Sequence, residues 1–337
     1  MSDLLKIGTH NGQFHCDEVL ACYMLRQLPT YKNSPIVRTR DPAELDKCDI
    51  VVDVGGVYDA SKNRFDHHQR SFTETFSTID PTRPWNIKLS SAGLIYVHFG
   101  KQIIEQILLK HSIIDEKLVD VLYDKMYEQF VREIDAIDNG VEIAENKKYD
   151  ITTNLSSRVS YFNPAWNQEN LDENIQFNLA LDYVGKEFED KIKYYALVWW
   201  PARTYVEKAI NERFNLDDSG AIIRLEIPVP WKSHLFALEK DLNIPDSEIK
   251  YVISLDRVSQ TYRIICVPIN ENSFINRLSL PSEWCGLRDE ELSTKSAIQG
   301  CIFVHANGFI GGNKTFEGAL EMLQKSLELN NIKKRKL

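Results

Sequence analysis

The sequence has no apolar run of membrane-spanning length and no paired-cysteine motif, and each absence excludes a class of protein. The longest apolar runs are only as long as a β-strand, whereas a membrane-spanning helix needs about 20 apolar residues. The six cysteines include no Cys-x-x-Cys pair. This argues against a zinc ribbon and against a thioredoxin-like redox pair. We therefore expect an intracellular protein from a reducing compartment, with no membrane partner.

Basic charge is also scarce. The net charge is −9, and acidic residues outnumber basic ones in both halves of the chain. Binding to a nucleic acid would therefore need a local basic patch or a metal ion. The terminal run Lys333-Lys334-Arg335-Lys336 is interpreted as a solvated tail rather than a nuclear address. A candidate metal ligand follows within ten residues of Met1, so we expect no removable presequence.

The chain of 337 residues is long enough for two domains of about 100 to 200 residues each. Strand-sized apolar runs alternate with helical periodicity over 1–150, which predicts an α/β domain. Residues 151–170 show no periodicity and are interpreted as a linker. A helical connector, followed by alternating strands and helices over 171–330, predicts a smaller α+β C-terminal domain. Residues 331–337 form the basic tail.

The most informative stretch is Asp66-His67-His68, which lies between Arg64 and Arg70. It combines ligands for a hard cation with groups that bind phosphate. A solvated polar loop is the alternative interpretation. The metal interpretation gains support from further candidate ligands elsewhere in the first domain, which are His10, His15, Asp17, Asp53, Asp135 and Asp138.

Each further candidate follows a predicted strand or lies at a predicted helix end. His10, His15 and Asp17 fall in a turn between a strand and a helix, where ligands collect in α/β sheets. Asp53 ends the apolar run Ile50-Val51-Val52, where a carboxylate is costly unless it is paired or metal-bound. It is our first choice for a shared ligand, the alternative being an exposed acid that binds loop amides.

Asp135 and Asp138 lie near a helix C-terminus. Carboxylates there oppose the helix dipole, which favours a compensating cation over ordinary solvation. The sequence does not decide which of the two is a ligand.

This mixture of imidazoles and carboxylates suits manganese, or magnesium as the alternative, better than structural zinc. Two such ions about 3.5 to 4 Å apart can activate a water and stabilise both oxygens of a phosphoryl displacement. The sequence therefore predicts a hydrolase that uses two divalent cations to cleave phosphoesters. A glycine-bearing turn at 305–315, expected to lead into a helix N-terminus, would expose amides to an anion. The candidate substrate-binding residues are Arg70, His305, Asn307, Gly308, Gly311, Gly312 and Lys314.

Several segments together carry a family resemblance: 7–18, 53–56, 65–68, 91–93, 133–140 and 305–309. At these residues the chain resembles the DHH phosphoesterase superfamily, and more closely the melanocyte proliferating gene family of DHH-like exonucleases. The resemblance implies a DHH-type parallel-sheet catalytic domain, a smaller DHH-associated domain and an active site in the cleft. It also implies 3′-to-5′ exonuclease action on RNA, and leaves the nucleus, the cytoplasm, the mitochondrion and a homodimer open.

The superfamily pattern also implies roles for individual residues. His10 and His15 would bind one ion, Asp17 and His67 the other, and Asp53 would bridge them. His68 would face the scissile phosphate, and His68 and Asp66 are the candidate catalytic residues. His15 is a departure, since many superfamily members have an aspartate there. The alternatives are a small-molecule phosphohydrolase, such as a pyrophosphatase or nucleotide phosphodiesterase, and a non-catalytic nucleic-acid-binding or regulatory protein.

Overall fold

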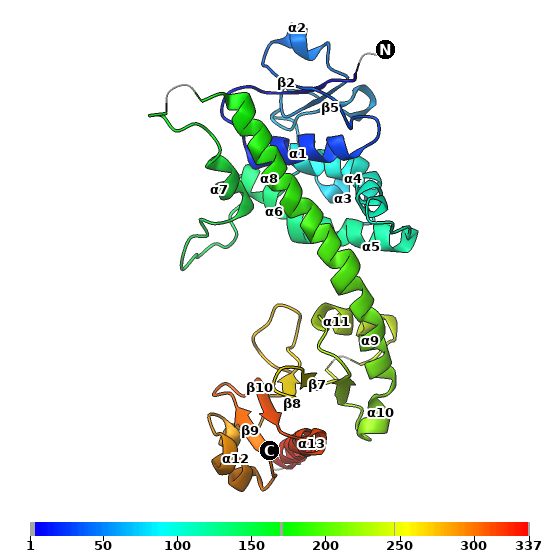
Figure 1. Cartoon of the computed structure of the whole chain (residues 1–337), viewed down its shortest axis with the longest axis vertical. Helices are drawn as coiled ribbons and strands as arrows, with labels where there is room; N and C mark the ends of the chain where they lie inside the picture. Colours follow the sequence, from blue (N-terminus) through cyan, green and yellow to red (C-terminus); the bar gives the residue numbers. More distant parts are fainter. Residues whose placement is uncertain (1–3, 169–170, 246, 336–337) are drawn as a thin grey trace. The chain divides into compact units, whose positions relative to one another are not determined.

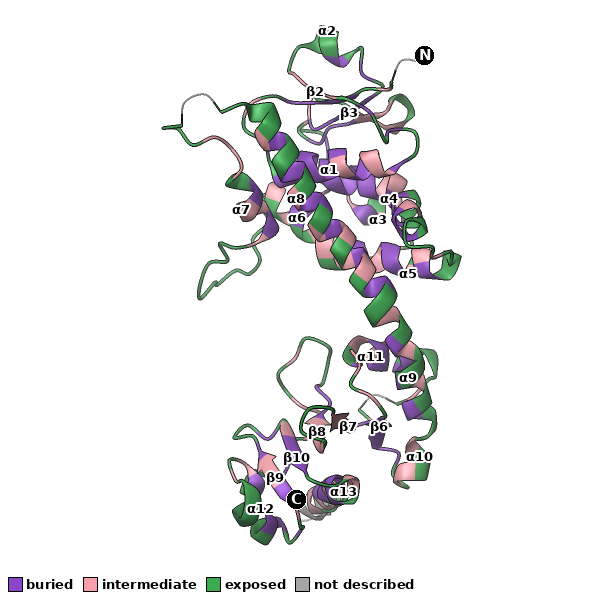
Figure 2. Ribbon diagram, viewed as in Figure 1, coloured by how far each residue is buried: buried purple, intermediate pink, exposed green. Residues whose placement is uncertain are grey.

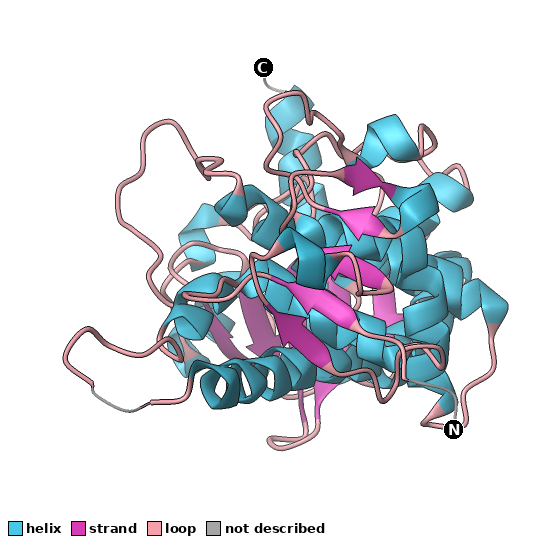
Figure 3. Ribbon diagram, turned by 90° about the horizontal axis from the view of Figure 1, so that it is seen from above, coloured by secondary structure: helices cyan, strands magenta, loops and turns pink. Residues whose placement is uncertain are grey.

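The computed structural model describes residues 4–168, 171–245 and 247–335, with side chains up to residue 330. The chain divides into two compact units, Met1–Ala196 and Leu197–Leu337 (Figure 1). Each unit contains one sheet in its described residues. Figure 3 shows the strands in magenta among the helices in cyan. The expected α/β fold class is therefore confirmed. No helix in the described part of the chain is long and apolar enough to cross a membrane.

The sheet of the first unit has the strand order β2-β1-β3-β5-β4. β1 (Ile7–Thr9) pairs in parallel with β2 (Ile36–Arg38) and with β3 (Ile50–Val52). β5 (Arg64–Phe65) continues the parallel order beside β3, and β4 (Tyr58–Asp59) pairs antiparallel at the edge. The apolar runs at 4–7, 35–39 and 50–52 predict the first three strands, but no pattern predicts the two-residue strands β4 and β5.

The helices of the first unit cover this sheet. α1 (Cys16–Gln27) packs against α4 (Ser91–Leu109) and α8 (Glu173–Tyr194). Most of α1 is buried, as its purple ribbon in Figure 2 shows. The remaining helices are α2 (Pro42–Leu45), a 3-10 turn (Ala60–Lys62), α3 (Phe76–Ile79), α5 (Glu116–Met126), a π-helical turn (Tyr127–Val131), α6 (Arg132–Asp138) and α7 (Leu155–Ser160).

The sheet of the second unit has the order β6-β7-β8-β10-β9. Its strands are β6 (Ile222–Leu225), β7 (Tyr251–Asp256), β8 (Thr261–Cys266), β9 (Cys301–Val304) and β10 (Ile310–Asn313). Only β6 and β7 pair in parallel. The helices are α9 (Trp200–Asn211), α10 (Arg213–Leu216), α11 (Lys232–Asp241), a 3-10 turn (Ser282–Trp284), α12 (Asp289–Ser296) and α13 (Phe316–Arg335), after a π-helical turn at Tyr195–Trp199.

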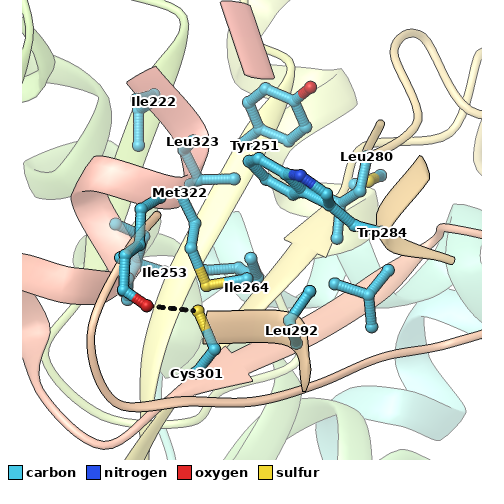
Figure 4. Packing of buried hydrophobic residues seen from close by; sticks show 14 residues of the cluster. Ile222, Tyr251, Ile253, Ile264, Leu280, Trp284, Leu292, Cys301, Met322 and Leu323 are labelled. Atoms are coloured by element: carbon cyan, nitrogen blue, oxygen red, sulfur yellow. Dashed lines mark hydrogen bonds between the residues drawn. The ribbon is translucent and has the colours of Figure 1, made fainter. Parts of the chain in front are cut away.

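Side chains alternate between two cores along β7. Tyr251 and Ile253 belong to a cluster with Trp284 and Met322, drawn in Figure 4, whereas Val252 belongs to a separate cluster. This period of two is what a strand buried on both faces requires.

The division at Ala196 falls later than the boundary expected at residues 150 to 170. The reason is that α7 and α8 pack against α1 and so belong to the first unit. Of the expected linker, residues 169–170 lie outside the described residues, as do residues 336–337 of the basic tail. The backbone of α13 runs through the rest of that tail, to Arg335.

Candidate metal centre

Three candidate ligands follow three neighbouring strands of the parallel sheet. His10 comes after β1, Asp53 after β3, and His67 two residues after the end of β5. Because the carboxyl ends of parallel strands meet at one edge of a sheet, these side chains converge. The short strand β5, which the sequence pattern did not reveal, is what brings His67 to this edge.

Asp53 lies between the two imidazoles. Its Oδ2 is 3.3 Å from His10 Nε2, and its Oδ1 is 3.2 Å from His67 Nε2. Ser91 Oγ also donates a hydrogen bond to Oδ1, at 3.1 Å. The backbone of Asp53 is left-handed, with φ of 60°. Such a conformation costs a non-glycine residue of order 1–3 kcal/mol and is typical of functional sites.

Asp17 and Asp138 approach His67 from two helices. Asp17 lies in the first turn of α1 and Asp138 at the end of α6. His67 Nε2 is 3.2 Å from Asp138 Oδ2 and 3.8 Å from Asp17 Oδ2. The backbone N–H of Ser91 donates to Asp17 Oδ2 at 3.2 Å.

Several polar atoms at this point are buried without a hydrogen-bond partner. Among the described residues, Nδ1 of His67 and Oδ1 of Asp17 are in this state, and Nε2 of His67 lies 3.2 Å from Asp53 Oδ1 and Asp138 Oδ2 without the geometry of a hydrogen bond. A buried polar group without a partner costs about 1–3 kcal/mol. Lone pairs that converge without hydrogen bonds are what metal ligands require, so the donor set fits a divalent cation.

The charges at the centre also favour a bound cation. Burial raises the pKa of Asp17 well above its usual range, and the nearby Asp53 and Asp138 raise it further. Burial likewise raises the pKa of Asp138. Burial alone would also raise the pKa of Asp53, but His10 and His67 hold it below the usual value. Two buried carboxylates and a partly buried one repel one another, and a cation among them would remove that repulsion.

His15 lies on the rim of the centre. It is the N-cap residue of α1 and is exposed. Its ring can offer a ligand atom to two groups, one with His10, Glu18 and Asp53 and the other with Asp17 and Asp138. The structure therefore brings together His10, His15, Asp17, Asp53, His67 and Asp138, all predicted as ligands.

Asp135, the other candidate acid of α6, does not face the metal centre but accepts hydrogen bonds at the start of α4. Its Oδ1 accepts hydrogen bonds from Ser90 N, Ser90 Oγ and Gly93 N at 3.0, 2.7 and 3.0 Å. Its Oδ2 accepts one from Tyr127 at 3.0 Å. The carboxylate thus binds the N-terminus of α4, and burial raises its pKa to about 7. Asp138, and not Asp135, faces His67.

His68 and Asp66 form a hydrogen-bonded pair. His68 Nδ1 lies 2.7 Å from Asp66 Oδ1, and Asp66 also accepts the N–H groups of His68 and Gly56 at 3.1 and 2.6 Å. The Asp66 side chain is buried, whereas that of His68 is 61% exposed. The hydrogen bond to Asp66 raises the pKa of His68. The buried acid therefore orients an accessible imidazole.

A pocket of about 520 Å³ opens onto this centre. Its lining includes His15, Asp17, His67, His68, Asp138 and Lys88. Sequence reasoning missed Lys88, Glu18 and Ser91 as functional residues. The position of Glu18 three residues after His15, the spacing of a capping box, was the signal available for it.

The candidate substrate-binding residues lie in both units. In the first, Arg70 is exposed. In the second, His305, Asn307 and Gly308 occupy the turn between β9 and β10. Lys314 follows β10 and is exposed.

The expectation of a glycine-bearing turn that leads into a helix is wrong for Gly311 and Gly312, which lie in strand β10. A Cβ atom on Gly311 would lie 2.9 Å from the carbonyl oxygen of Phe303 on β9. These glycines thus permit close strand pairing. A glycine pair is rare within a strand, so the sequence pattern alone favours a turn at this position.

The sequence matches a family model over residues 6–327, described as MYG1_exonuc, an uncharacterised protein family (UPF0160). The MYG1 exonuclease of Homo sapiens is 53% identical, over 96% of this chain and 85% of the human one. That of Rattus norvegicus is 52% identical, over 96% and 84%. The MYG1 protein of Caenorhabditis elegans is 48% identical, over 98% of both chains.

One solved structure, the DHH domain of a member of the s1p family of ribosomal proteins, aligns with 96% of this chain and 86% of its own. The identity is 12% and the TM-score 0.25.

Proposed function

Since this chain belongs to the MYG1_exonuc family (UPF0160) and is a phosphoesterase of the nuclease type, we propose that it degrades RNA from the 3′ end with two divalent cations. The observation that carries the proposal is the position of Asp53, which presents one carboxylate oxygen to His10 and the other to His67. A carboxylate shared in this way suits a pair of ions.

The ligands divide into two sets around Asp53. His10 and His15 would hold one ion, and Asp17, His67 and Asp138 would hold the other. Bound ions of this kind lower the pKa of a water and stabilise the charge of a phosphoryl transition state. Manganese is the ion we expect, with magnesium as the alternative, because the set mixes imidazole with oxygen ligands.

The residues of the chain itself would bind and orient the phosphate. The exposed imidazole of His68, held by Asp66, borders the pocket and can donate a hydrogen bond to a phosphate oxygen. Lys88 lines the same pocket and supplies positive charge. Both groups would stabilise negative charge on the scissile phosphate.

Exposed aromatic residues that follow a pocket-lining helix in the chain favour a polymeric substrate. Ser160 of α7 lines the pocket, and Tyr161 and Trp166, which follow it, are 82% and 97% exposed. Asn163 ties this segment to the ligand-bearing turn, since it accepts Phe14 N at 2.9 Å and donates to Phe14 O at 2.8 Å. Exposed rings of this kind stack on the bases of a single strand. A pyrophosphatase would not need such rings, because pyrophosphate has no bases to stack on them.

A substrate panel tests the proposal. RNA labelled at either end, single-stranded DNA, dinucleotides and pyrophosphate are incubated with the full chain in manganese, in magnesium and in EDTA. We expect metal-dependent release of nucleotides from the 3′ end of RNA. Preferred cleavage of pyrophosphate or dinucleotides would instead favour the small-molecule phosphohydrolase.

The same assay tests the site. We expect Asp53→Ala and His67→Ala to lose at least about 100-fold in turnover, since even residues that only hydrogen-bond to metal ligands are worth about 10–100-fold. Asp46→Ala, which removes an exposed aspartate of the same unit, is the control. Wild-type turnover in either purified site variant would refute the assignment.

A further inference from the structure

Glu18 is a fully buried carboxylate in the first turn of α1, directly beside the metal centre. Its Oε1 and Oε2 accept the backbone N–H of His15 at 2.9 and 3.0 Å. Its Oε1 also lies 2.9 Å from Nε2 of His10. The side chain thus contacts two of the predicted ligands.

Helix capping explains only the first of these contacts. In a capping box, the third helical residue accepts the N–H of the N-cap residue, and a neutral glutamine does this as well as a glutamate. A buried charge, in contrast, is expensive unless it is paired or bound to a cation. The negative charge of Glu18 therefore needs a reason beyond the cap.

The imidazole of His10 shows where that charge is directed. Its Nδ1 lies 3.1 Å from the carbonyl oxygen of Asn11 and 3.2 Å from the guanidinium of Arg40, which hold the ring in place. Its Nε2 faces Glu18 Oε1 at 2.9 Å and Asp53 Oδ2 at 3.3 Å. Because His10 Nε2 lies close to two carboxylate oxygens, it is placed at the edge of a cation site.

The charges of the two ligand sets are unequal without Glu18. The set around His67 contains the carboxylates of Asp17 and Asp138 besides the shared Asp53. The set around His10 contains two imidazoles and only the shared carboxylate. Manganese and magnesium prefer oxygen ligands, so this set lacks both an oxygen and a negative charge. Glu18 supplies both, since His10, His15, Glu18 and Asp53 each offer a ligand atom within 4.8 Å of the others.

We infer that Glu18 is a ligand of the ion on the His10 side, which it holds together with His10, His15 and Asp53. The inference rests on the proposed two-ion function and adds a residue to its site. It also assigns two tasks to one side chain, because the carboxylate that binds the ion also caps α1.

Manganese binding to the full chain tests this inference without any measurement of activity. Calorimetry and the electron paramagnetic resonance signal of free Mn²⁺ give the number of sites and their affinities. Glu18→Gln keeps the cap but removes the charge. We expect it to retain one wild-type site and to weaken the other at least about 10-fold, the lower limit for residues that support a metal. Glu105→Gln, at an exposed glutamate of the same unit, is the matched control.

A rescue variant separates ligation from capping. His15→Asp in the Glu18→Gln background returns one carboxylate to the same set, and we expect it to recover part of the lost affinity. If Glu18→Gln does not fold, Glu18→Asp tests the inference instead. It keeps the negative charge but moves the carboxylate oxygens away from the ion, because the side chain is shorter. It should weaken one site.

Two results would overturn the inference, and they are distinguishable. Unchanged Mn²⁺ affinities in a folded Glu18 variant would show that the carboxylate only caps the helix. A wild-type chain that binds no Mn²⁺ would overturn the proposed function as well.

Discussion

Gly93 and Asp135 are so close that a Cβ atom on Gly93 would lie 2.4 Å from both carboxylate oxygens of Asp135. The contact places a negative charge at the N-terminus of α4, where backbone N–H groups lack partners within the helix. It also holds the first turn of α4 in position. Ser91, in that turn, donates hydrogen bonds to Asp17 and Asp53, so the contact supports the metal centre.

Gly93→Ala should therefore destabilise the first unit. Overpacking of a core and loss of a buried hydrogen bond each cost about 1–3 kcal/mol, so we expect the free energy of unfolding to fall by about 2 to 6 kcal/mol. Urea unfolding followed by circular dichroism measures it. Gln102→Ala, at an exposed position of the same helix, should change stability by less than about 0.5 kcal/mol. Equal stability of the two variants would contradict the packing described here.

Replacement by asparagine should have opposite effects at the two acids of α6, on metal binding at one and on stability at the other. Asp138→Asn should weaken Mn²⁺ binding at least about 10-fold, and the chelated protein should keep its stability because a repulsive charge is removed. Asp135→Asn should lower stability, since an amide cannot accept all four hydrogen bonds, and the folded protein should bind Mn²⁺ normally. Calorimetry and thermal unfolding in EDTA measure both effects. The reverse pattern would make Asp135 the ligand.

Trp166→Ala should weaken the binding of single-stranded RNA. Stacking of a base on an aromatic ring is worth about 1–3 kcal/mol, so we expect a loss of about 5- to 150-fold in affinity. Fluorescence anisotropy with a labelled oligonucleotide in EDTA measures it. Cleavage of a dinucleotide, which offers few bases for stacking, should fall less. Ile114→Ala, at another exposed side chain of the same unit, is the control. Unaltered RNA binding in Trp166→Ala would remove the argument for a stacking surface.

In the second unit, Arg277 and Glu239 form a buried ion pair with two hydrogen bonds of 2.6 and 2.7 Å. Arg277→Met leaves the Glu239 charge buried alone, and breaking such a pair costs about 3–5 kcal/mol. The pair of Arg203 with Asp241 is also 2.6 Å long, but Asp241 is 59% exposed. Arg203→Met should therefore cost no more than about 1 kcal/mol. Urea unfolding of both variants checks the difference, and similar losses would contradict it.

The sequence revealed those parts of the centre that depend on a regular pattern. The unbroken β-branched run Ile50-Val51-Val52 predicted a buried strand that ends in Asp53, and the structure has that strand. Strand β5 has only two residues, too few to show a period, so the position of His67 could not be derived from pattern alone.

Charged residues on helices were harder to interpret. Glu18 lies in a first helical turn, where an acid is ordinarily explained by the helix dipole. Asp135 and Asp138 lie on one helix three residues apart, and only the packing of α4 shows which carboxylate is already occupied. Which carboxylate binds a metal depends on contacts between distant segments, and local periodicity does not reveal such contacts.

The π-helical turn at Tyr127–Val131 has a consequence for the evolution of this centre. A π-turn accommodates one extra residue in an α-helix, and each residue of an α-helix turns the chain by about 100°. Deleting a single residue from this turn would rotate all of α6, so that Asp135 would leave the N-terminus of α4 and Asp138 would leave His67. The direction in which both acids face therefore depends on the number of residues that precede α6. An insertion or deletion in the π-helical turn would be as damaging as the loss of a ligand.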